Sequence, residues 1–222
     1  MKQHRGKYGL QITLKNYCES WRMNVELHNI RDFKVVPKEC VDYIGKYMGS
    51  TQYKVDSERT TEECTVYLST SCGLKKDRTD AWIFDIDDTL LSTVPYYKKN
   101  GFGRECLRSA TVDNLVDVGY HGWTSLILRG EDDENKDIHK YKADVRKKLI
   151  SSGYKIWGIL GDQWSSIEGL PTAKRSFKLP NPLYYVASLI SLNYFCFYIN
   201  PLPPPTRGPI FCIHKLYVIS ID

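Results

Sequence analysis

Hydrophobic and polar positions follow two different repeats in the two main parts of this 222-residue chain. Before residue 80, apolar residues recur every three or four positions around and after Pro37, and again from about Val55 to Ser71. This spacing predicts two helices, and Pro37 suits the first turn of a helix. After residue 80, short apolar runs alternate with helical stretches. We therefore predict a helical N-terminal region over 17–80 and a core over 81–186.

The apolar runs of the core are short enough to be strands. They are predicted at 81–86, 125–128, 155–160 and 175–179. Helical spacing is found between them, at 107–118 and 138–152, and a glycine follows each of these two segments. Strands that alternate with helices predict an α/β fold in which a parallel sheet is built with right-handed crossovers.

The two ends of the chain lack these patterns. Residues 1–16 are expected to lie outside the core. The segment 183–199 approaches the length of a membrane span, but Asn193 and four tyrosines interrupt it. The proline-rich segment 201–205 then prevents any regular element. We therefore expect residues 187–222 to form an apolar, proline-rich tail outside the fold, and not a membrane anchor.

Composition and charge narrow the class of protein. The chain is 42% hydrophobic and 26% charged, which is ordinary for a globular protein, and its net charge is +5. Basic residues are scattered among acids, so we expect no nucleic-acid partner. The seven cysteines include no C-x-x-C pair, which argues against a zinc ribbon. The four before residue 80 could pair in an oxidising compartment. No apolar segment follows the basic N-terminus, so no secretory signal is predicted.

The strongest chemical signal is an apolar run that ends on three acids and a threonine, Asp85-Ile86-Asp87-Asp88-Thr89. Clustered carboxylates repel one another, and burial adds a desolvation cost, so a bound cation or phosphate chemistry is the expected reason for them. The D-x-D-x-T spacing places Asp85, Asp87 and Thr89 on a tight loop after the strand. Open α/β sheets build their sites at this edge.

Each acid has a candidate role in phosphate chemistry. Asp85 is placed to attack phosphorus and form an aspartyl-phosphate, and Asp87 to protonate the leaving oxygen and then activate water. Magnesium is the expected cofactor because it takes hard oxygen ligands and often needs only one or two carboxylates. Asp162 follows the 155–160 strand and should reach the same edge, so Asp85, Asp87 and Asp162 are the candidate metal ligands. Lys142 is the candidate cation for the phosphoryl oxygens.

Structural interpretations compete with these roles. In these interpretations Asp88 is a solvated or capping acid, and Lys142 lies on a solvated helix face. Asp162 is then only a residue that favours the Gly-Asp turn. Three histidines share no metal-ligand spacing and read as surface or core residues: His28, His121 and His139.

At these residues the chain resembles the plant acid phosphatases related to vegetative storage proteins, within the haloacid dehalogenase-like superfamily. The resemblance covers 17–186 and rests on four stretches: 21–25, 81–103, 110–115 and 161–165. It implies a Rossmann-like core that hydrolyses phosphomonoesters with magnesium. Asp85 matches the family's nucleophile, Asp87 its acid/base, Lys142 its phosphate-side lysine and Asp162 its metal ligand.

The chain departs from this family in two places. Gly103 runs directly into 104–109, so the cap helices and the strand of the second motif are expected to be missing. In the family that strand lies between the first strand and the strand at 125–128, so its loss should leave the sheet incomplete. Ser166 stands where active relatives often carry a second acid near the metal, which weakens the expected metal affinity.

Two functions therefore remain open. The first is an acid phosphatase that acts on a small phosphomonoester and is impaired or inactive; the second is a non-catalytic protein of the vegetative storage type. The resemblance implies a secreted or vacuolar location, and a homodimer stays open. The sequence does not fix the physiological substrate, the disulfide pairing or the oligomeric state.

Overall fold

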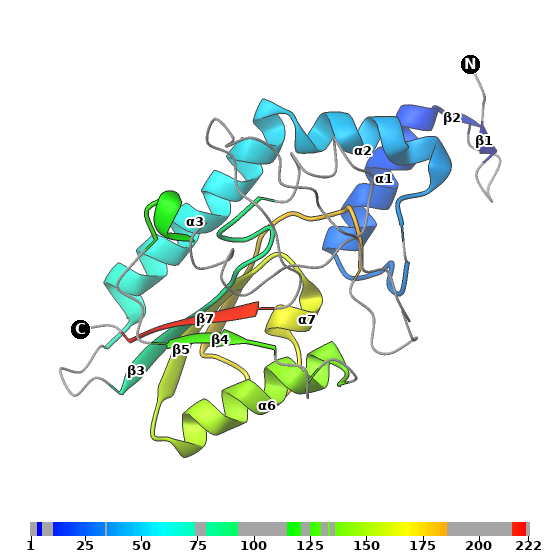
Figure 1. The fold of residues 1–222 in the computed structure, drawn as a ribbon. Coiled ribbons are helices and arrows are strands. Elements are labelled where there is room, and N and C mark those ends of the chain that lie inside the picture. The colour runs from blue at the N-terminus through cyan, green and yellow to red at the C-terminus, as the bar shows by residue number, and fades with distance from the viewer. Residues whose placement is uncertain are drawn as a thin grey trace, which may run out of the picture.

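A computed structural model describes residues 4–5, 11–33, 35–73, 79–92, 115–120, 125–129, 133, 136–185 and 215–220. Helices lie on both faces of a central sheet, and a second group of helices leads into it from the N-terminus (Figure 1). The elements in chain order are β1 (His4–Arg5), β2 (Gln11–Ile12), α1 (Leu14–Glu26), η1 (Lys38–Cys40), α2 (Val41–Met48), α3 (Thr51–Ser71), β3 (Asp80–Asp85), β4 (Ser125–Leu128), α6 (Ile138–Ser151), β5 (Lys155–Gly161), α7 (Trp164–Ile167), β6 (Arg175–Lys178) and β7 (Lys215–Ser220).

In the helical N-terminal region, hydroxyl side chains cap the first turns of α1 and α3. The Thr13 side chain accepts a hydrogen bond from the Asn16 backbone N–H at 3.1 Å, and the Ser50 side chain accepts one from Tyr53 at 3.2 Å. Such caps satisfy donors that have no partner inside the helix. The Ser50 cap starts α3 four residues before the predicted start at Val55. A disulfide joins Cys18 of α1 to Cys40 before α2.

The sheet has the strand order β4-β7-β3-β5-β6. Strands β3, β5 and β6 are parallel, as predicted, and their bounds agree with the predicted runs within one or two residues. β3 is buried along almost its whole length, which is typical of a strand covered on both faces. Of the predicted helix at 107–118, the structure describes only the end, where 115–117 form a helical turn.

The tail prediction is wrong for β7. We expected residues 187–222 outside the fold, but Lys215–Ser220 lies between β3 and β4 and pairs antiparallel with both. The physical reason is that both flanking strands would otherwise present a row of unpaired backbone N–H and C=O groups. Residues 187–214 and 221–222 of that tail lie outside the described residues.

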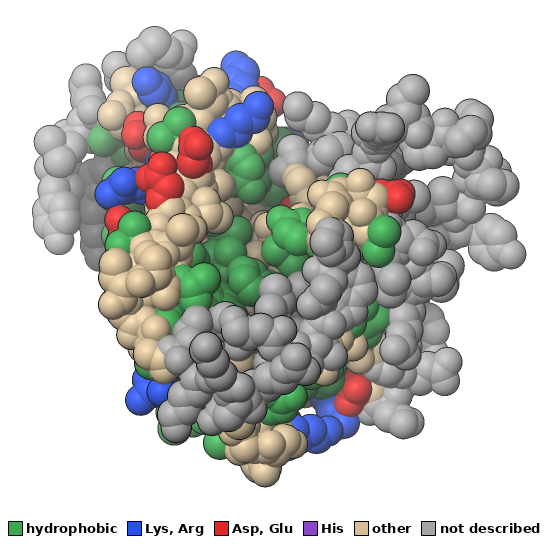
Figure 2. Space-filling model, turned by 90° about the vertical axis from the view of Figure 1, so that its left-hand side faces the viewer, with side chains coloured by type: hydrophobic (Ala, Val, Ile, Leu, Met, Phe, Trp, Pro, Cys, Tyr) green, Lys and Arg blue, Asp and Glu red, His purple; other side chains and the backbone are tan. Residues whose placement is uncertain are grey.

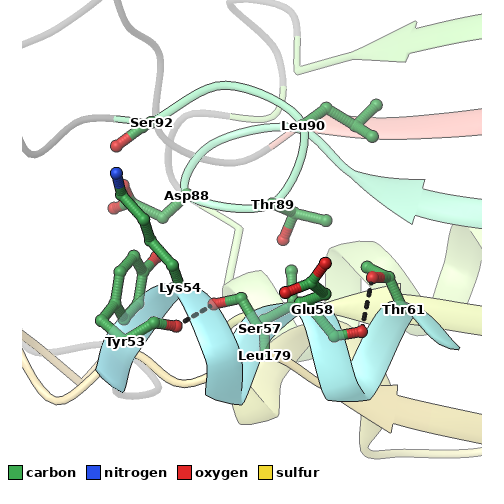
Figure 3. Close-up of a pocket in the computed structure, with 10 residues that line it drawn as sticks. All are labelled: Tyr53, Lys54, Ser57, Glu58, Thr61, Asp88, Thr89, Leu90, Ser92 and Leu179. Carbon is green, nitrogen blue, oxygen red and sulfur yellow. Dashed lines mark hydrogen bonds between the residues drawn. The ribbon is translucent and has the colours of Figure 1, made fainter. Parts of the chain in front are cut away.

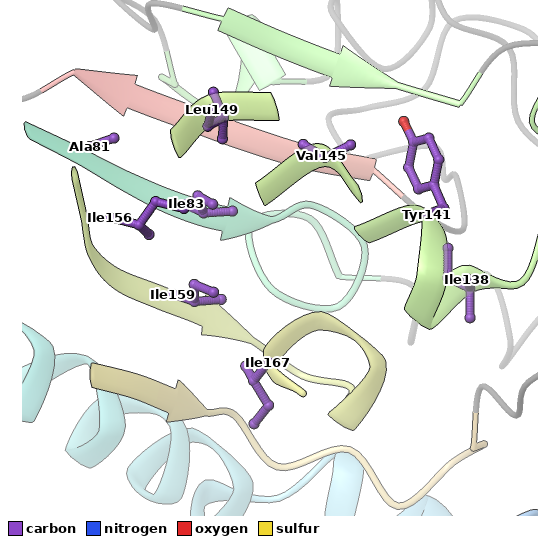
Figure 4. Close-up of a cluster of buried hydrophobic side chains, with 9 residues drawn as sticks. All are labelled: Ala81, Ile83, Ile138, Tyr141, Val145, Leu149, Ile156, Ile159 and Ile167. Carbon is purple, nitrogen blue, oxygen red and sulfur yellow. The ribbon is translucent and has the colours of Figure 1, made fainter. Parts of the chain in front are cut away.

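The main hydrophobic cluster fills the space between the sheet and α6 (Figure 4). Its buried members come from β3, β5, α6 and α7: Ala81, Ile83, Ile138, Tyr141, Val145, Leu149, Ile156, Ile159 and Ile167. Each large apolar side chain buried in this way stabilises the fold by ~1.5–3 kcal/mol. This packing fixes α6 against the sheet and so sets the position of the polar residues that α6 carries.

The opposite face of the sheet packs on α3. Trp82, Leu160, Phe177 and Leu179 form a buried cluster there, and Tyr67 of α3 contacts it. Strand β5 has glycine at 158, and a Cβ there would lie 2.4 Å from the Trp82 ring. Glycine at 158 is therefore required for the indole to approach β5 this closely.

None of the described helices combines the length and the apolar composition of a membrane span.

Candidate active site

Four acids meet at the carboxyl edge of the sheet. Asp85 is the last residue of β3, Asp87 and Asp88 lie in the loop after it, and Asp162 follows β5; all four are buried. Thr89 joins the two loops, because its hydroxyl donates to Asp162 Oδ1 at 3.2 Å and accepts from the Asp162 backbone N–H at 3.0 Å. The expectation that Asp162 lies at the same edge as the β3 acids is therefore confirmed.

Lys142 reaches this edge from α6. Its Nζ donates to Asp85 Oδ2 and to Ser166 Oγ, both at 2.8 Å, and only 2% of its side chain is exposed. The alternative interpretation of Lys142 as a solvated lysine is therefore wrong. The Ser166 hydroxyl also donates to Asp85 Oδ2, so the ammonium and the hydroxyl hold the same carboxylate oxygen.

The close approach of α7 to β5 depends on Gly161. A Cβ at this position would lie 2.7 Å from the Ser166 Cβ and 3.5 Å from the Asp85 Cβ. Any larger residue would push α7 away from the sheet, because two carbon atoms do not approach so closely. Gly161 thereby places Ser166, which is fully buried, against the Asp85 carboxylate.

Sequence reasoning missed the polar residues that surround Asp88 and Asp162. Asp88 is 5% exposed, so its interpretation as a solvated acid is wrong. Its φ of 53° is in the left-handed region, which Asp tolerates better than most residues, and its Oδ2 accepts from the Tyr184 hydroxyl at 2.9 Å. Asn181 Nδ2 donates to Asp162 Oδ2 at 2.6 Å. Asn181 belongs to a turn-like segment whose sequence gives no signal of this contact.

The clustered acids change the protonation of Asp162. Burial, together with the negative charges of Asp85 and Asp88, raises the pKa of Asp162 to about 7, although the Asn181 hydrogen bond and the charge of Lys178 act in the opposite direction. Desolvation and like charges both disfavour the ionised form of a carboxyl group. A bound cation would offset this negative charge.

The donor chemistry of the edge fits magnesium. The side chains are carboxylates, the hard oxygen ligands that Mg²⁺ prefers, and Mg²⁺ commonly keeps several waters. Among the described residues, however, no three His, Cys, Asp or Glu side chains form a group that could hold a metal ion. The fit is therefore to an ion held by few protein ligands and by water or phosphate oxygens.

A cavity of about 360 Å³ lies beside the acid loop. The α3 side chains of Tyr53, Lys54, Ser57, Glu58 and Thr61 point toward the loop across this space (Figure 3). The loop contributes Asp88, Thr89, Leu90 and Ser92, and Leu179 completes the lining. Its volume lies in the range of small-ligand sites.

On the face shown in Figure 2, Lys and Arg side chains are interspersed with Asp and Glu, and hydrophobic side chains line a central hollow.

Arg146, one turn after Lys142 on α6, binds the loop that follows α7. Its guanidinium is fully buried and donates to the backbone carbonyls of Pro171 at 2.8 Å, Ser166 at 3.1 Å, Gly169 at 3.1 Å and Glu168. Burial lowers the pKa of Arg146 to about 10. One planar side chain thus satisfies four carbonyls and fixes the end of α7, which carries Ser166.

We predict that Arg146→Met lowers the free energy of unfolding by ~3–5 kcal/mol, because buried carbonyls lose their donors. Arg146→Lys should be intermediate, since an ammonium cannot reproduce the guanidinium's planar set of donors. Urea unfolding of the three proteins at pH 7 measures the difference. Equal stability of Arg146→Met and the wild-type chain would contradict the assignment.

His28 connects the N-terminal helices to the core. Its ring stacks on Trp164 with centroids 4.4 Å apart, Nδ1 lies 2.8 Å from Glu168 Oε1, and Nε2 lies 2.8 Å from the Tyr185 hydroxyl oxygen. Burial lowers the pKa of His28, and this outweighs the opposing effect of Glu168. His28 is 8% exposed, in agreement with its interpretation as a core histidine.

We predict that His28 makes stability depend on pH. Its pKa is lower in the folded than in the unfolded chain, so as the pH falls below 6.5 the unfolded chain takes up a proton that the folded chain resists. Stability is then lost with a slope of up to ~1.4 kcal/mol per pH unit. His28→Gln should reduce this slope. Urea unfolding between pH 5 and 8 measures the slopes, and equal slopes in His28→Gln and wild type would refute the prediction.

A D-x-D-x-T loop after the first core strand, a buried lysine paired with its first aspartate and a second acid after a neighbouring parallel strand define a haloacid dehalogenase-like protein. The chain belongs to the HAD superfamily, subfamily IIIB (acid phosphatase), whose family model matches residues 4–108 and 104–187. The two matched parts meet at 104–108, next to the place where we expected a family segment to be missing.

Plant proteins are similar to the chain over most of its length. It is 36% identical to acid phosphatase 1 of Solanum lycopersicum over 213 positions, which cover 76% of this chain and 83% of that protein. It is also 36% identical to vegetative storage protein 2 of Arabidopsis thaliana, covering 82% and 84% of the two chains, and 35% identical to the stem 28 kDa glycoprotein of Glycine max, covering 76% and 84%. The alignment with the Solanum protein has 213 positions, but it covers only 76% of the 222 residues of this chain. Within the aligned region, the Solanum protein therefore has residues that this chain lacks.

Proposed function

We propose that this chain is a phosphomonoester hydrolase of the acid phosphatase type, with impaired activity. The observation that supports this most directly is the buried contact of Lys142 with Asp85 at an edge that also holds Asp162. A buried ion pair at the carboxyl end of a parallel sheet is costly to maintain for stability alone, and it occurs where α/β proteins place their sites. Family membership supports the same chemistry.

In the proposed reaction, a carboxylate oxygen of Asp85 attacks the phosphorus of a small phosphomonoester, and the bond from phosphorus to the leaving oxygen breaks. Asp87 gives its proton to that oxygen. Asp87 then takes a proton from water as the water attacks the aspartyl-phosphate, which releases phosphate and regenerates Asp85. Lys142 offsets negative charge on the phosphoryl oxygens.

In this proposal one or two of the predicted ligands Asp85, Asp87 and Asp162 would hold Mg²⁺, and water or phosphate oxygens would complete its coordination. When bound, the ion supplies positive charge that stabilises the phosphoryl oxygens as negative charge develops on them. The burial of Asp85, Asp88 and Asp162 at one edge supports a cation at this place, because clustered carboxylates repel one another. The cavity bordered by Asp88 and Thr89 offers room for the rest of a small ester.

Two features support low activity. Ser166 is a neutral residue in contact with both Lys142 and Asp85, where the family's active members often have an acid. The family resemblance implies that the missing segment would carry the cap and a hydroxyl that binds phosphate. Each donor to developing negative charge contributes roughly 10²–10³ in rate.

Release of phosphate from p-nitrophenyl phosphate tests the proposal. We expect weak release that requires Mg²⁺ and that disappears in Asp85→Asn. Asp144→Asn, which changes an exposed acid of α6 paired with Lys147, is the matched control and should keep the activity. Release that is independent of Mg²⁺, or that is unchanged in Asp85→Asn, would overturn the mechanism.

The alternative is a non-catalytic protein of the vegetative storage type. Ser166 favours it, and so does the similarity to vegetative storage protein 2. Complete absence of phosphate release from a folded chain supplied with Mg²⁺ would support this alternative.

We also propose a secreted or vacuolar location. The disulfide between Cys18 and Cys40 supports it, because such bonds persist in oxidising compartments. The partner in this proposal is a small phosphomonoester and not nucleic acid.

A further inference from the structure

The strand β7 lies in a part of the chain that family membership does not explain. The family model matches residues up to 187, and β7 begins at Lys215. Nevertheless β7 takes a central place in the sheet, with β3 on one side and β4 on the other. It is antiparallel to both, whereas β3, β5 and β6 are parallel to one another. Figure 1 shows β7, in red, running between these strands.

The pairing of β7 reaches the candidate nucleophile. β5 pairs with β3 only as far as Phe84, opposite Leu160, whereas β7 continues one residue further and places Leu216 opposite Asp85. The backbone at Asp85 is therefore held from the side of β7. A carboxylate that must meet Lys142 Nζ within 2.8 Å depends on a fixed backbone at this point.

The same strand attaches β4 to the sheet. β4 pairs with β7 from Ser125 opposite Val218 to Leu128 opposite Lys215, and it has no other strand partner among the described residues. Without β7, the backbone N–H and C=O groups that β3 and β4 now pair with β7 would have no strand partner. Each such group left buried costs ~1–3 kcal/mol.

We propose that the space between β3 and β4 is a strand-binding site whose ligand is the chain's own segment 215–220, and that this binding positions Asp85. Strand addition of this kind uses backbone hydrogen bonds for affinity and alternate side chains for specificity. The ligand is supplied by the same chain, because a tethered segment reaches an effective concentration on the order of 1 mM, above that of a second copy in solution.

Hydrogen exchange of the full-length chain tests the proposal independently of enzymatic activity. Tyr217 lies opposite both Phe84 and Leu126, so Tyr217→Pro removes a donor from the middle of a central strand. We expect backbone amides of β3 and β4 to exchange at least ~10-fold faster in this variant, while those of β6, α1 and α2 stay within about twofold. Ser191→Pro, in the same tail but outside β7, is the matched control and should change none of them.

A peptide with the sequence of residues 213–222, added at millimolar concentration, should restore slow exchange in β3 of Tyr217→Pro, and a scrambled peptide should not. Unchanged exchange in β3 of the variant, failure of the peptide, or uniformly faster exchange throughout the chain would each overturn the proposal. The last outcome would show that β7 has only a global structural role.

A cysteine pair tests the register and the source of the strand without weakening it. Ser125→Cys with Val218→Cys puts the two cysteines on directly paired residues of antiparallel strands, whose Cα atoms are ~4.5–5.5 Å apart, within the range of a disulfide. In a mixture of ¹⁵N-labelled and unlabelled chains, mass spectrometry should find the 125–218 disulfide only between peptides of the same label. Absence of this disulfide, or pairs of mixed label, would overturn the assignment of the chain's own β7 as the ligand.

Discussion

Insertion of the missing family segment between Gly103 and Arg104 is expected to raise Mg²⁺-dependent phosphate release by roughly 10²–10³ or more. The segment would be taken from acid phosphatase 1 of Solanum lycopersicum. The family resemblance implies that it supplies a hydroxyl donor to the phosphoryl group, and a single preorganised donor has about that effect. Steady-state release of phosphate from p-nitrophenyl phosphate by the chimera and the parent chain measures the change.

Asp85→Asn in the same chimera provides the control, since loss of a nucleophile removes most of the rate enhancement. The family resemblance implies that the restored strand would lie between β3 and β4, where β7 now lies, so hydrogen exchange should show β7 released. A folded chimera that binds its strand there and yet stays as inactive as the parent would contradict the catalytic interpretation.

Lys142→Met is expected to lower the free energy of unfolding by ~3–5 kcal/mol. Both side chains of the ion pair are almost fully buried, at 2% for Lys142 and 4% for Asp85, so the variant leaves a buried carboxylate without its cation. Breaking one partner of a buried pair costs far more than breaking an exposed pair. Urea unfolding at pH 7 measures the loss.

Lys147→Met is the matched control on the same helix. Lys147 pairs with Asp144 at 3.1 Å, but its side chain is 60% exposed, so the expected loss is only ~0–1 kcal/mol. The double variant Lys142→Met with Asp85→Leu should recover much of the stability, because no charge is then left buried. Equal losses in Lys142→Met and Lys147→Met would contradict the assigned burial of the pair.

Much of the candidate site could be read from the sequence because each residue follows a local pattern. Asp85 and Asp87 come directly after an apolar run, and Asp162 directly follows another, so a parallel arrangement of the two strands is enough to bring them to one edge. Lys142 is a candidate because a phosphate site needs a cation and because the family resemblance matches it, since a lysine on a charged helix gives no signal of burial. The structure then supplied its partners, Asp85 and Ser166.

Other site residues could not have been found in this way. Asn181 and Tyr184 reach Asp162 and Asp88 from a segment without regular structure. Arg146 has the same charge and helical setting as its exposed neighbours on α6, yet it is fully buried, and its guanidinium donates to one backbone carbonyl of α7 and three of the loop after it. These contacts join residues far apart in sequence, so no local pattern contains them.

The sequence by itself determined the helices and strands of the core, the acid edge and the family, because periodicity and motif spacing are properties of neighbouring residues. Only the tertiary structure decided the place of β7. The apolar run at 215–220 is compatible with a tail outside the fold, and its choice of β3 and β4 depends on backbone groups that those strands leave unpaired. A segment pairs with distant strands whose backbone groups lack partners in the rest of the fold. The sequence of the segment itself does not contain this information, because those strands are far from it along the chain.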